Sequence, residues 1–335
     1  MNLQVKVALA ACGCFLATAA LAGAAGGGKG PFGEYCRYVE AGPPGPRGNK
    51  LVVFNRSGGI RIRRKGREIR VVNLFMGRCT GGQPTVDNLD RIVLRVTKKP
   101  PESEPVRIDL RGGPFQPGAT PEPSRDQIEI LADGFALEVE GEKGADAMVA
   151  RTLGGGHIGV DLDGAAHNQR RDYEIVVPRS PYALKLIGGR GRDRLDTRGI
   201  TNMGDHRQRH VIRLYGKHGS DLILGGPRDE WRIEDGAGDD LVRTGGGDDE
   251  VLLGRGHDTV FGGRGRDSLY FAVYERFAGL DPTDMSDRVF GGPGADRLSD
   301  ENRHRDVLRC GSGIDEFETE PRDRPGADCE RLVHP

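Results

Sequence analysis

Short runs in which apolar and polar residues alternate recur along most of the chain. The first are LVVF from Leu51 and the pair IRIRR and REIRVV on either side of Lys65-Gly66. Alternation with a period of two predicts strands with one buried face, and two such runs joined by a short turn predict a hairpin. Similar runs follow, broken by glycine, proline or aspartate: DRIVLRV, VRIDL, QIEILA, FALEVE, AMVART, GHIGVDL, YEIVV and YALKLI. Because no segment of the mature chain carries the 3.6-residue period of a long helix, we expect an all-β protein.

Beyond these runs the pattern acquires a nine-residue period. Four units follow one another from Gly236 without interruption: GAGDDLVRT, GGGDDEVLL, GRGHDTVFG and GRGRDSLYF. Separate copies read GGRGRDRLD from Gly188, GKHGSDLIL from Gly216, GGPGADRLS from Gly291 and CGSGIDEFE from Cys310. Every unit has an aspartate after its glycine-rich turn and an apolar residue two positions after that aspartate. The apolar residues are Leu195, Ile223, Val242, Val251, Val260, Leu269, Leu298 and Phe317.

Each unit is expected to form a six-residue turn followed by a three-residue strand. Glycine supplies positive φ and lets neighbouring backbones approach closely, and alternation along the strand points one apolar side chain inward. Alternate turns of such a coil lie on opposite sides, so Asp240 should face Asp258, and Asp249 should face Asp267. Two carboxylates and the turn carbonyls then offer about six oxygens, which suits Ca²⁺ better than Mg²⁺, whose octahedron is tighter and retains water.

The predicted calcium ligands are the aspartates and glycines of these turns. In the uninterrupted block they are Asp240, Asp249, Asp258 and Asp267 with Gly236, Gly238, Gly245, Gly247, Gly254, Gly256, Gly263 and Gly265; outside it they are Asp193, Asp221, Asp296 and Asp315. The alternative is a solenoid of glycine and aspartate turns that binds no metal, and it stays open above all for the outlying turns.

The units match the pattern GGxGxDxUx, in which U is apolar, and the chain from about Gly188 to Phe317 therefore resembles RTX, or haemolysin-type, calcium-binding repeat proteins. The resemblance implies a parallel β-roll with Ca²⁺ between stacked turns. The segment DVLRCGSGIDEFETEPRDRPGADCERL is similar to the terminal cap of many secreted actinobacterial-type calcium-binding proteins. The middle of the chain resembles the degenerate β-rich N-terminal half of the same proteins.

Three features depart from the pattern. The turn GGPRDEWRI from Gly225 has Glu230 where aspartate belongs and Arg232 at the inward position, so we expect this turn not to coordinate calcium. Asp193 and Asp221 lack a partner 18 residues away. The spacings are 28 and 19 residues from Asp193 through Asp221 to Asp240, and 29 and 19 residues from Asp267 through Asp296 to Asp315, so the ninefold phase slips by one or two residues.

The N-terminus has the features of an export signal. Lys6 precedes an apolar run from Val7 to Leu21, and small residues allow cleavage after Ala22 or Ala24. The alternative is a membrane anchor, but the run is shorter than the roughly 20 residues that a spanning helix needs. No later segment could span a membrane, which predicts a secreted, extracellular protein. The net charge of −1 gives no general attraction to nucleic acid.

Four cysteines remain after removal of the signal: Cys36, Cys79, Cys310 and Cys329. An even number in an exported protein indicates disulfides, and four cysteines allow three connectivities. Proximity along the chain favours Cys36–Cys79 and Cys310–Cys329. The second bond would clamp the last turn, which no further repeat covers.

No catalytic motif was found. The chain has no H-E-x-x-H, no G-x-S-x-G and no phosphate-binding loop, and the single G-x-G-x-x-G match at Gly154 is not followed by a helical pattern. The hydrophobic content of 36% and the 53 glycines also argue against a large α/β enzyme. We therefore expect a protein that is not an enzyme.

The pattern divides the chain into six parts. They are a signal peptide at 1–22, a Gly/Pro-rich linker at 23–50, a β-rich region that can be a degenerate solenoid at 51–185, calcium-binding repeats at 186–270, an irregular insertion at 271–290, and final repeats with a disulfide-clamped cap at 291–335. The expected function is a calcium-stabilised structural or interaction module with an extracellular-matrix or cell-surface partner. The alternative is a secreted hydrolase with an unrecognised N-terminal catalytic domain.

Overall fold

The computed structural model describes most of the chain after the N-terminal segment. The described residues are 36–39, 49–55, 59–73, 79–85, 87, 89–96, 105–113, 129–132, 136–162, 175–177, 183–202, 211–271, 286–300 and 304–333. All of them belong to one compact unit, Glu34–Pro335. The predicted signal peptide at 1–22 and most of the linker at 23–50 lie outside the described residues, and Cys36–Val39 within the predicted linker forms a strand.

Strands, turns and bends make up the described residues, and the strands form two large sheets. Sheet 1 has the order β26 (Arg324–Pro325), β24 (Val307–Ser312), β22 (Arg288–Pro293), β20 (Thr259–Phe261), β18 (Leu241–Arg243), β16 (Leu222–Leu224), β14 (Arg194–Gly199), β10 (Ala147–Leu153), β11 (His157–Asp161), β12 (Ile175–Val177), β8 (Glu129–Ala132), β6 (Arg91–Val96), β2 (Lys50–Asn55), β1 (Cys36–Val39), β5 (Cys79–Thr80). Sheet 2 has the order β27 (Arg331–Leu332), β25 (Glu316–Glu318), β23 (Arg297–Asp300), β21 (Ser268–Phe271), β19 (Glu250–Leu253), β17 (Glu230–Ala237), β15 (Val211–His218), β13 (Ala183–Arg190), β9 (Ala136–Glu140), β7 (Val106–Asp109), β3 (Ile60–Lys65), β4 (Glu68–Asn73).

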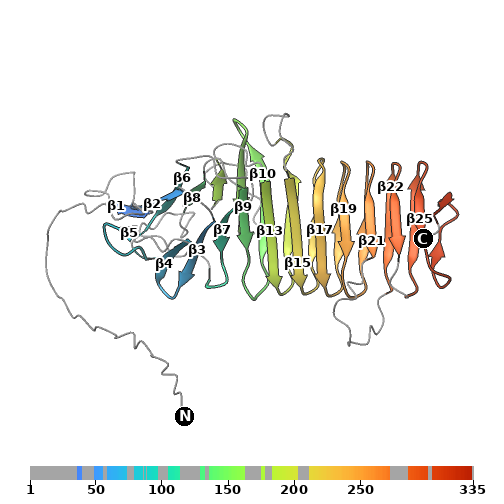
Figure 1. Cartoon of the computed structure of the whole chain (residues 1–335), viewed down its shortest axis with the longest axis horizontal. Helices are drawn as coiled ribbons and strands as arrows, with labels where there is room; N and C mark the ends of the chain where they lie inside the picture. Colours follow the sequence, from blue (N-terminus) through green and yellow to red (C-terminus); the bar gives the residue numbers. More distant parts are fainter. Residues whose placement is uncertain are drawn as a thin grey trace, which may run out of the picture. The chain divides into compact units, whose positions relative to one another are not determined.

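From β13 onward, successive strands alternate between the two sheets, and each pairs in parallel with the next strand of its own sheet (Figure 1). In sheet 1, Leu241 of β18 lies between Leu222 of β16 and Thr259 of β20. In sheet 2, Leu269 of β21 pairs with Leu298 of β23. This arrangement is a parallel β-roll, so the predicted all-β fold of stacked nonapeptide turns is confirmed.

The earlier part of the chain extends the same two sheets. Strands β2, β6 and β8 continue sheet 1 in parallel, and β3, β7, β9 and β13 continue sheet 2. This part also contains antiparallel pairs, among them β10 with β11 and β3 with β4. The pair β3 and β4 is the predicted hairpin at Lys65-Gly66, where Gly66 has a φ of 62°. The boundary near residue 185 stays a prediction, because the sheets run through it.

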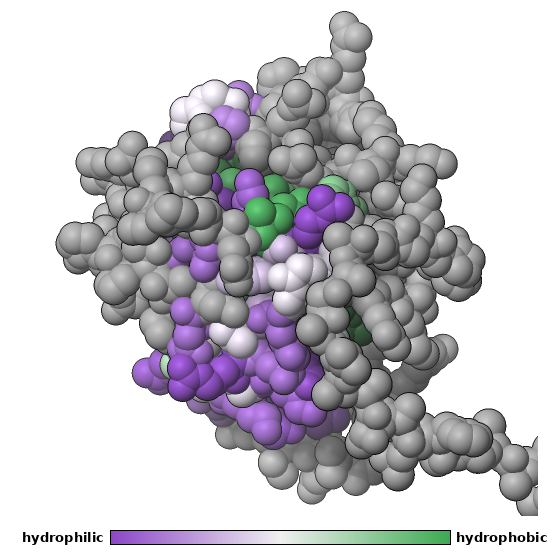
Figure 2. All heavy atoms as spheres, turned by 90° about the vertical axis from the view of Figure 1, so that its left-hand side faces the viewer, coloured by the Kyte–Doolittle hydropathy of each residue, from purple (hydrophilic) through white to green (hydrophobic). Residues whose placement is uncertain are grey.

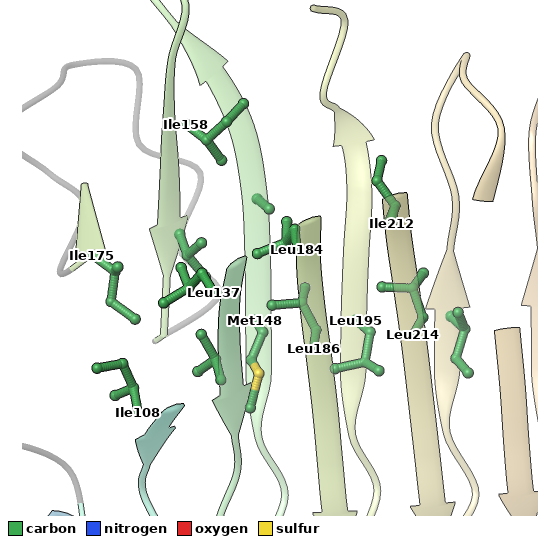
Figure 3. Packing of buried hydrophobic residues seen from close by; sticks show 14 of the residues in the cluster. Ile108, Leu137, Met148, Ile158, Ile175, Leu184, Leu186, Leu195, Ile212 and Leu214 are labelled. Carbon is green, nitrogen blue, oxygen red and sulfur yellow. The ribbon is translucent and has the colours of Figure 1, made fainter. Parts of the chain in front are cut away.

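The hydrophobic core lies between the two sheets along their whole length. Each of the apolar residues predicted to point inward is buried: seven are 0% exposed and Phe317 is 9% exposed. Figure 3 shows Leu186 of β13, Leu195 of β14 and Leu214 of β15 within this layer. The end view in Figure 2 shows apolar residues at the centre of the N-terminal end, with hydrophilic residues gathered on one side. One inward face per strand is what the period-two pattern requires.

The prediction that Arg232 points inward is wrong. The pairing of β15 with β17 shifts register, so that Ile212 faces Glu230 but Arg213 faces Arg232. Trp231 is therefore an extra residue in β17, and its side chain is 46% exposed. After this β-bulge the inward residue is Ile233, which is 0% exposed. The bulge also explains why Asp221 and Asp240 are 19 residues apart rather than 18.

No helix in the described part of the chain is long and apolar enough to cross a membrane.

Candidate calcium sites in the stacked turns

The turns of the β-roll align acidic residues in two rows, one leading into each sheet. Each acidic residue stands at or directly before the first residue of a strand, so strand register also fixes the row. Row 1 leads into sheet 1 and contains Asp146, Asp193, Asp221, Asp240, Asp258, Asp287, Asp306 and Asp323. Row 2 leads into sheet 2 and contains Glu230, Asp249, Asp267, Asp296, Asp315 and Glu330.

One hydrogen bond repeats along both rows. The backbone N–H of each acidic residue donates to a carboxylate oxygen of the next residue in its row, at 2.6 to 3.3 Å. The Asp240 N–H bonds Oδ1 of Asp258 at 2.9 Å, and the Asp249 N–H bonds Oδ1 of Asp267 at 3.0 Å. The two pairs that the sequence predicted therefore lie face to face, on opposite sides of the coil.

Asp193 and Asp221, expected to stand without partners, belong to row 1. The Asp193 N–H donates to Oδ1 of Asp221 at 2.7 Å, and the Asp221 N–H donates to Oδ1 of Asp240 at 2.6 Å. The sequence-based expectation failed because strand pairing restores the stacking after each extra residue. Asp296 and Asp315 lie in row 2, where Asp296 accepts from the Asp267 N–H at 2.9 Å.

Glu230 takes the place of an aspartate at the start of row 2. Its side chain is 0% exposed, and its Oε1 accepts from Oγ1 of Thr197 at 3.1 Å and from the Gly226 N–H at 3.0 Å. Its own N–H donates to Oδ1 of Asp249 at 2.7 Å. The longer side chain therefore still belongs to the row. The expectation that this turn does not coordinate calcium stays a prediction.

Several row members escaped the sequence analysis. They are Asp146, Asp287, Asp306, Asp323 and Glu330. Their turns lack the regular glycine spacing, so the nonapeptide pattern does not mark them. A weaker signal was available, since Asp287 and Asp306 each stand two residues before a fully buried apolar residue, Val289 and Leu308.

The glycines permit the close stacking that the rows need. Of the eight glycines predicted in the uninterrupted block, all but Gly254 have positive φ, such as 136° at Gly238. A Cβ at Gly238 would overlap the carbonyl of Gly219 in the preceding turn of its row. Lys217, which replaces a glycine, adopts a φ of 81°.

The carboxylates are suited to a bound cation. Among the described row aspartates, Oδ2 has no hydrogen-bond partner in Asp193, Asp221, Asp240, Asp249, Asp258, Asp267, Asp296, Asp306 and Asp315. All nine side chains are almost fully buried. A buried carboxylate oxygen without a partner is costly, and a hard divalent cation removes that cost. The residues present therefore fit Ca²⁺: Oδ1 accepts the backbone N–H of the preceding row member, and Oδ2 is left to bind the ion.

Burial also perturbs the acidity of these groups. It raises the pKa of Asp240 to about 8, with the negative charge of Asp258 adding to the effect, and it raises the pKa of Asp267 to about 8, with Asp249 contributing. The pKa of Asp258 is raised to about 7 by the same burial. Without a cation, the rows therefore hold protons near neutral pH, and a bound cation would displace them.

A family model for the RTX calcium-binding nonapeptide repeat matches residues 234–269 and 283–301, in four copies. The chain carries RTX calcium-binding nonapeptide repeats. The matched ranges contain Asp240 to Asp267 and also Asp287 and Asp296, which lie one unit on in each row. Comparison with curated proteins and with solved structures gave no match. RTX repeats bind Ca²⁺, so this protein has a calcium-binding β-roll.

The RTX β-roll ends in a disulfide-linked segment. Cys310 of β24 is bonded to Cys329, with their Cα atoms 5.0 Å apart, which confirms the predicted clamp. Cys36 is also disulfide-bonded, and its Cα partner across the β1–β5 pairing is Cys79. This register is compatible with the predicted Cys36–Cys79 bond, which stays a prediction.

Proposed function

We propose that this protein is an exported structural or interaction module whose β-roll is ordered by extracellular Ca²⁺. The observation that carries the proposal is the pair of buried carboxylate rows, each continuous from turn to turn. Like charges that are stacked in a dry interior repel one another, and bound protons or cations between the turns offset that repulsion. The signal-like N-terminus and the Cys310–Cys329 bond support an oxidising compartment outside the cytoplasm.

The module is expected to act through its surface rather than through catalysis. The described strands of residues 51–185 belong to the same two sheets as the repeats. The alternative of a hydrolase with a catalytic domain in this region has no specific observation in its favour. Direct hydrolase assays on the purified protein test it, and a matrix or cell-surface partner remains part of the proposal.

Thermal unfolding with and without calcium tests the proposed function. Because calcium binds only the folded β-roll, a hundredfold excess over its Kd should stabilise that state by about 2.7 kcal/mol per site. We expect the melting temperature, followed by far-UV circular dichroism, to rise in millimolar Ca²⁺ and to rise less in Mg²⁺. Identical melts in EDTA and in Ca²⁺ would contradict the proposal.

A further inference from the structure

Asp235 is an acidic residue that the nonapeptide pattern does not require. It stands directly before Gly236, near the end of β17 and ahead of the turn that leads to Asp240. The corresponding position of the following turns is occupied by Thr244, Leu253 and Gly262. Despite its charge, the Asp235 side chain is 0% exposed.

The Asp235 carboxylate lies against the row 1 pair. Carboxylate oxygens of Asp235, Asp240 and Asp258 all lie within 4.8 Å of one another. Oδ1 of Asp235 accepts the N–H groups of Gly236 and Gly254, each at 2.6 Å, which fixes the orientation of the side chain. Oδ2 has no hydrogen-bond partner in the described residues, and the same holds for Oδ2 of the two row aspartates.

The opposite row provides a contrast. There the position equivalent to Asp235 is Thr244, whose Oγ1 donates to the carbonyl of Gly262. Asp249 and Asp267 therefore have no third carboxylate beside them from that position. The two turns are built on the same repeat, so at this position of the turn the difference between their sites is a carboxylate in one and a hydroxyl in the other.

The three-carboxylate arrangement recurs once more in row 1. Asp300, at the end of β23, lies with Asp306 and Asp323 so that their carboxylate oxygens are within 4.8 Å of one another. Asp323 belongs to the segment after the last strand of the repeats, between Cys310 and Cys329. In both groups an aspartate near the end of a sheet 2 strand joins two successive row 1 aspartates.

We propose that Asp235 is a third carboxylate ligand, which makes the site at Asp240 and Asp258 a higher-affinity calcium site than the two-carboxylate site at Asp249 and Asp267. The proposal rests on the calcium binding of the proposed function. Affinity for Ca²⁺ follows the number of charged ligands and the rigidity of the site. Asp235 adds a third negative charge to the site, and the backbone N–H groups of Gly236 and Gly254 already hold its carboxylate in place.

Competitive titration of Ca²⁺ against a chromophoric chelator tests the proposal on the whole protein. The variants are Asp235→Asn, which keeps the shape, and Asp235→Gly, which gives the turn a glycine like that at Gly262. Losing an outer-shell partner of a metal site typically weakens metal binding about 10- to 100-fold. Removing a direct ligand should therefore raise the Kd of the most tightly bound calcium ion by at least about tenfold. The matched control is Glu234→Gln, because Glu234 pairs with Arg232 on the outer face of sheet 2.

The outcomes separate this inference from the proposed function. Wild-type protein that binds no calcium would overturn both. Wild-type protein that binds calcium, with Asp235→Asn or Asp235→Gly binding equally tightly, would overturn only the role of Asp235. If both variants fail to fold, Thr244→Asp decides: a second tightly bound calcium supports the inference, and unchanged affinities overturn it.

Discussion

At the scale of the residue, each row aspartate performs two tasks with two oxygens. Oδ1 accepts the N–H of the preceding row member, as Asp258 does from Asp240 at 2.9 Å, and so ties one turn to the next. In most row aspartates, Asp240 and Asp258 included, Oδ2 has no partner in the described residues and is left for a cation. The side chain is therefore structural and ligating at once, which is why aspartate recurs here although burial of its charge is unfavourable.

Replacing Asp258 by alanine should affect both tasks. The Asp240 N–H would lose its acceptor, which costs about 1 to 3 kcal/mol for a buried group, and calcium would lose one carboxylate ligand. We expect a lower melting temperature in EDTA and a lower calcium stoichiometry by calorimetry.

The control for this substitution is Glu250→Ala, which removes an acidic side chain from the outer face, where Glu250 pairs with Arg232. It should leave the stoichiometry unchanged. An equal loss of calcium in Asp258→Ala and Glu250→Ala would show that the carboxylate rows do not hold the ions.

At the scale of the element, the turn binds protons as well as calcium. Burial raises the pKa of Asp240, Asp267 and Asp287 to about 8, well above the value of about 3.9 for an exposed aspartate. Between these two values the calcium-free folded turn holds more protons than the unfolded chain. The free energy of unfolding therefore falls as pH rises through this range.

We expect the melting temperature of the protein in EDTA to decrease as pH rises from about 4 to about 8, and the loss to level off above about pH 8, where these groups are ionised in both states. In saturating Ca²⁺ the bound ion replaces the protons, so the stabilisation by calcium should grow with pH over the same range. Melts at several pH values check this, and proton release on adding Ca²⁺ to unbuffered protein is an independent measure. Stability in EDTA that rises with pH would contradict the expectation.

At the scale of the whole molecule, a β-roll needs its ends closed, because an open end exposes unpaired strand groups and apolar side chains. At the C-terminal end, β26 pairs with β24 and β27 pairs with β25, so both sheets receive one last short strand. The disulfide between Cys310 and Cys329 ties this segment to β24. Asp323 and Glu330 also continue the two rows into it.

Removing the clamp should loosen this end. The bond closes a loop with a sequence separation of 19 residues, and the chain-entropy model assigns such a loop about 3 kcal/mol. We expect the double variant Cys310→Ala/Cys329→Ala to melt at a lower temperature than the wild type in the same calcium concentration. Limited proteolysis should cut first between residues 318 and 333. An unchanged melt and cleavage pattern would show that strand pairing alone holds the cap.

The sequence by itself determined the strand-and-turn unit, the inward apolar residues and the pairing of Asp240 with Asp258. These features are local: glycine spacing sets the turn, and a period of two sets the buried face. The tertiary structure decided membership of the rows. Glu230, Asp287 and Asp306 joined them although their turns break the pattern, because parallel pairing brings strands back into register after extra residues.

The place of the Asp235 carboxylate beside Asp240 and Asp258 was likewise set by the tertiary structure. The position of Asp235 in the sequence does not set it apart. Asp235 becomes a neighbour of Asp258 only when the turn that carries Asp258 stacks on the turn that follows Asp235. A linear pattern records which residues share a turn. Contacts between turns depend on the register of the sheets. A bulge such as that at Trp231 changes this register, whereas the linear pattern shows only a one-residue slip in the spacing.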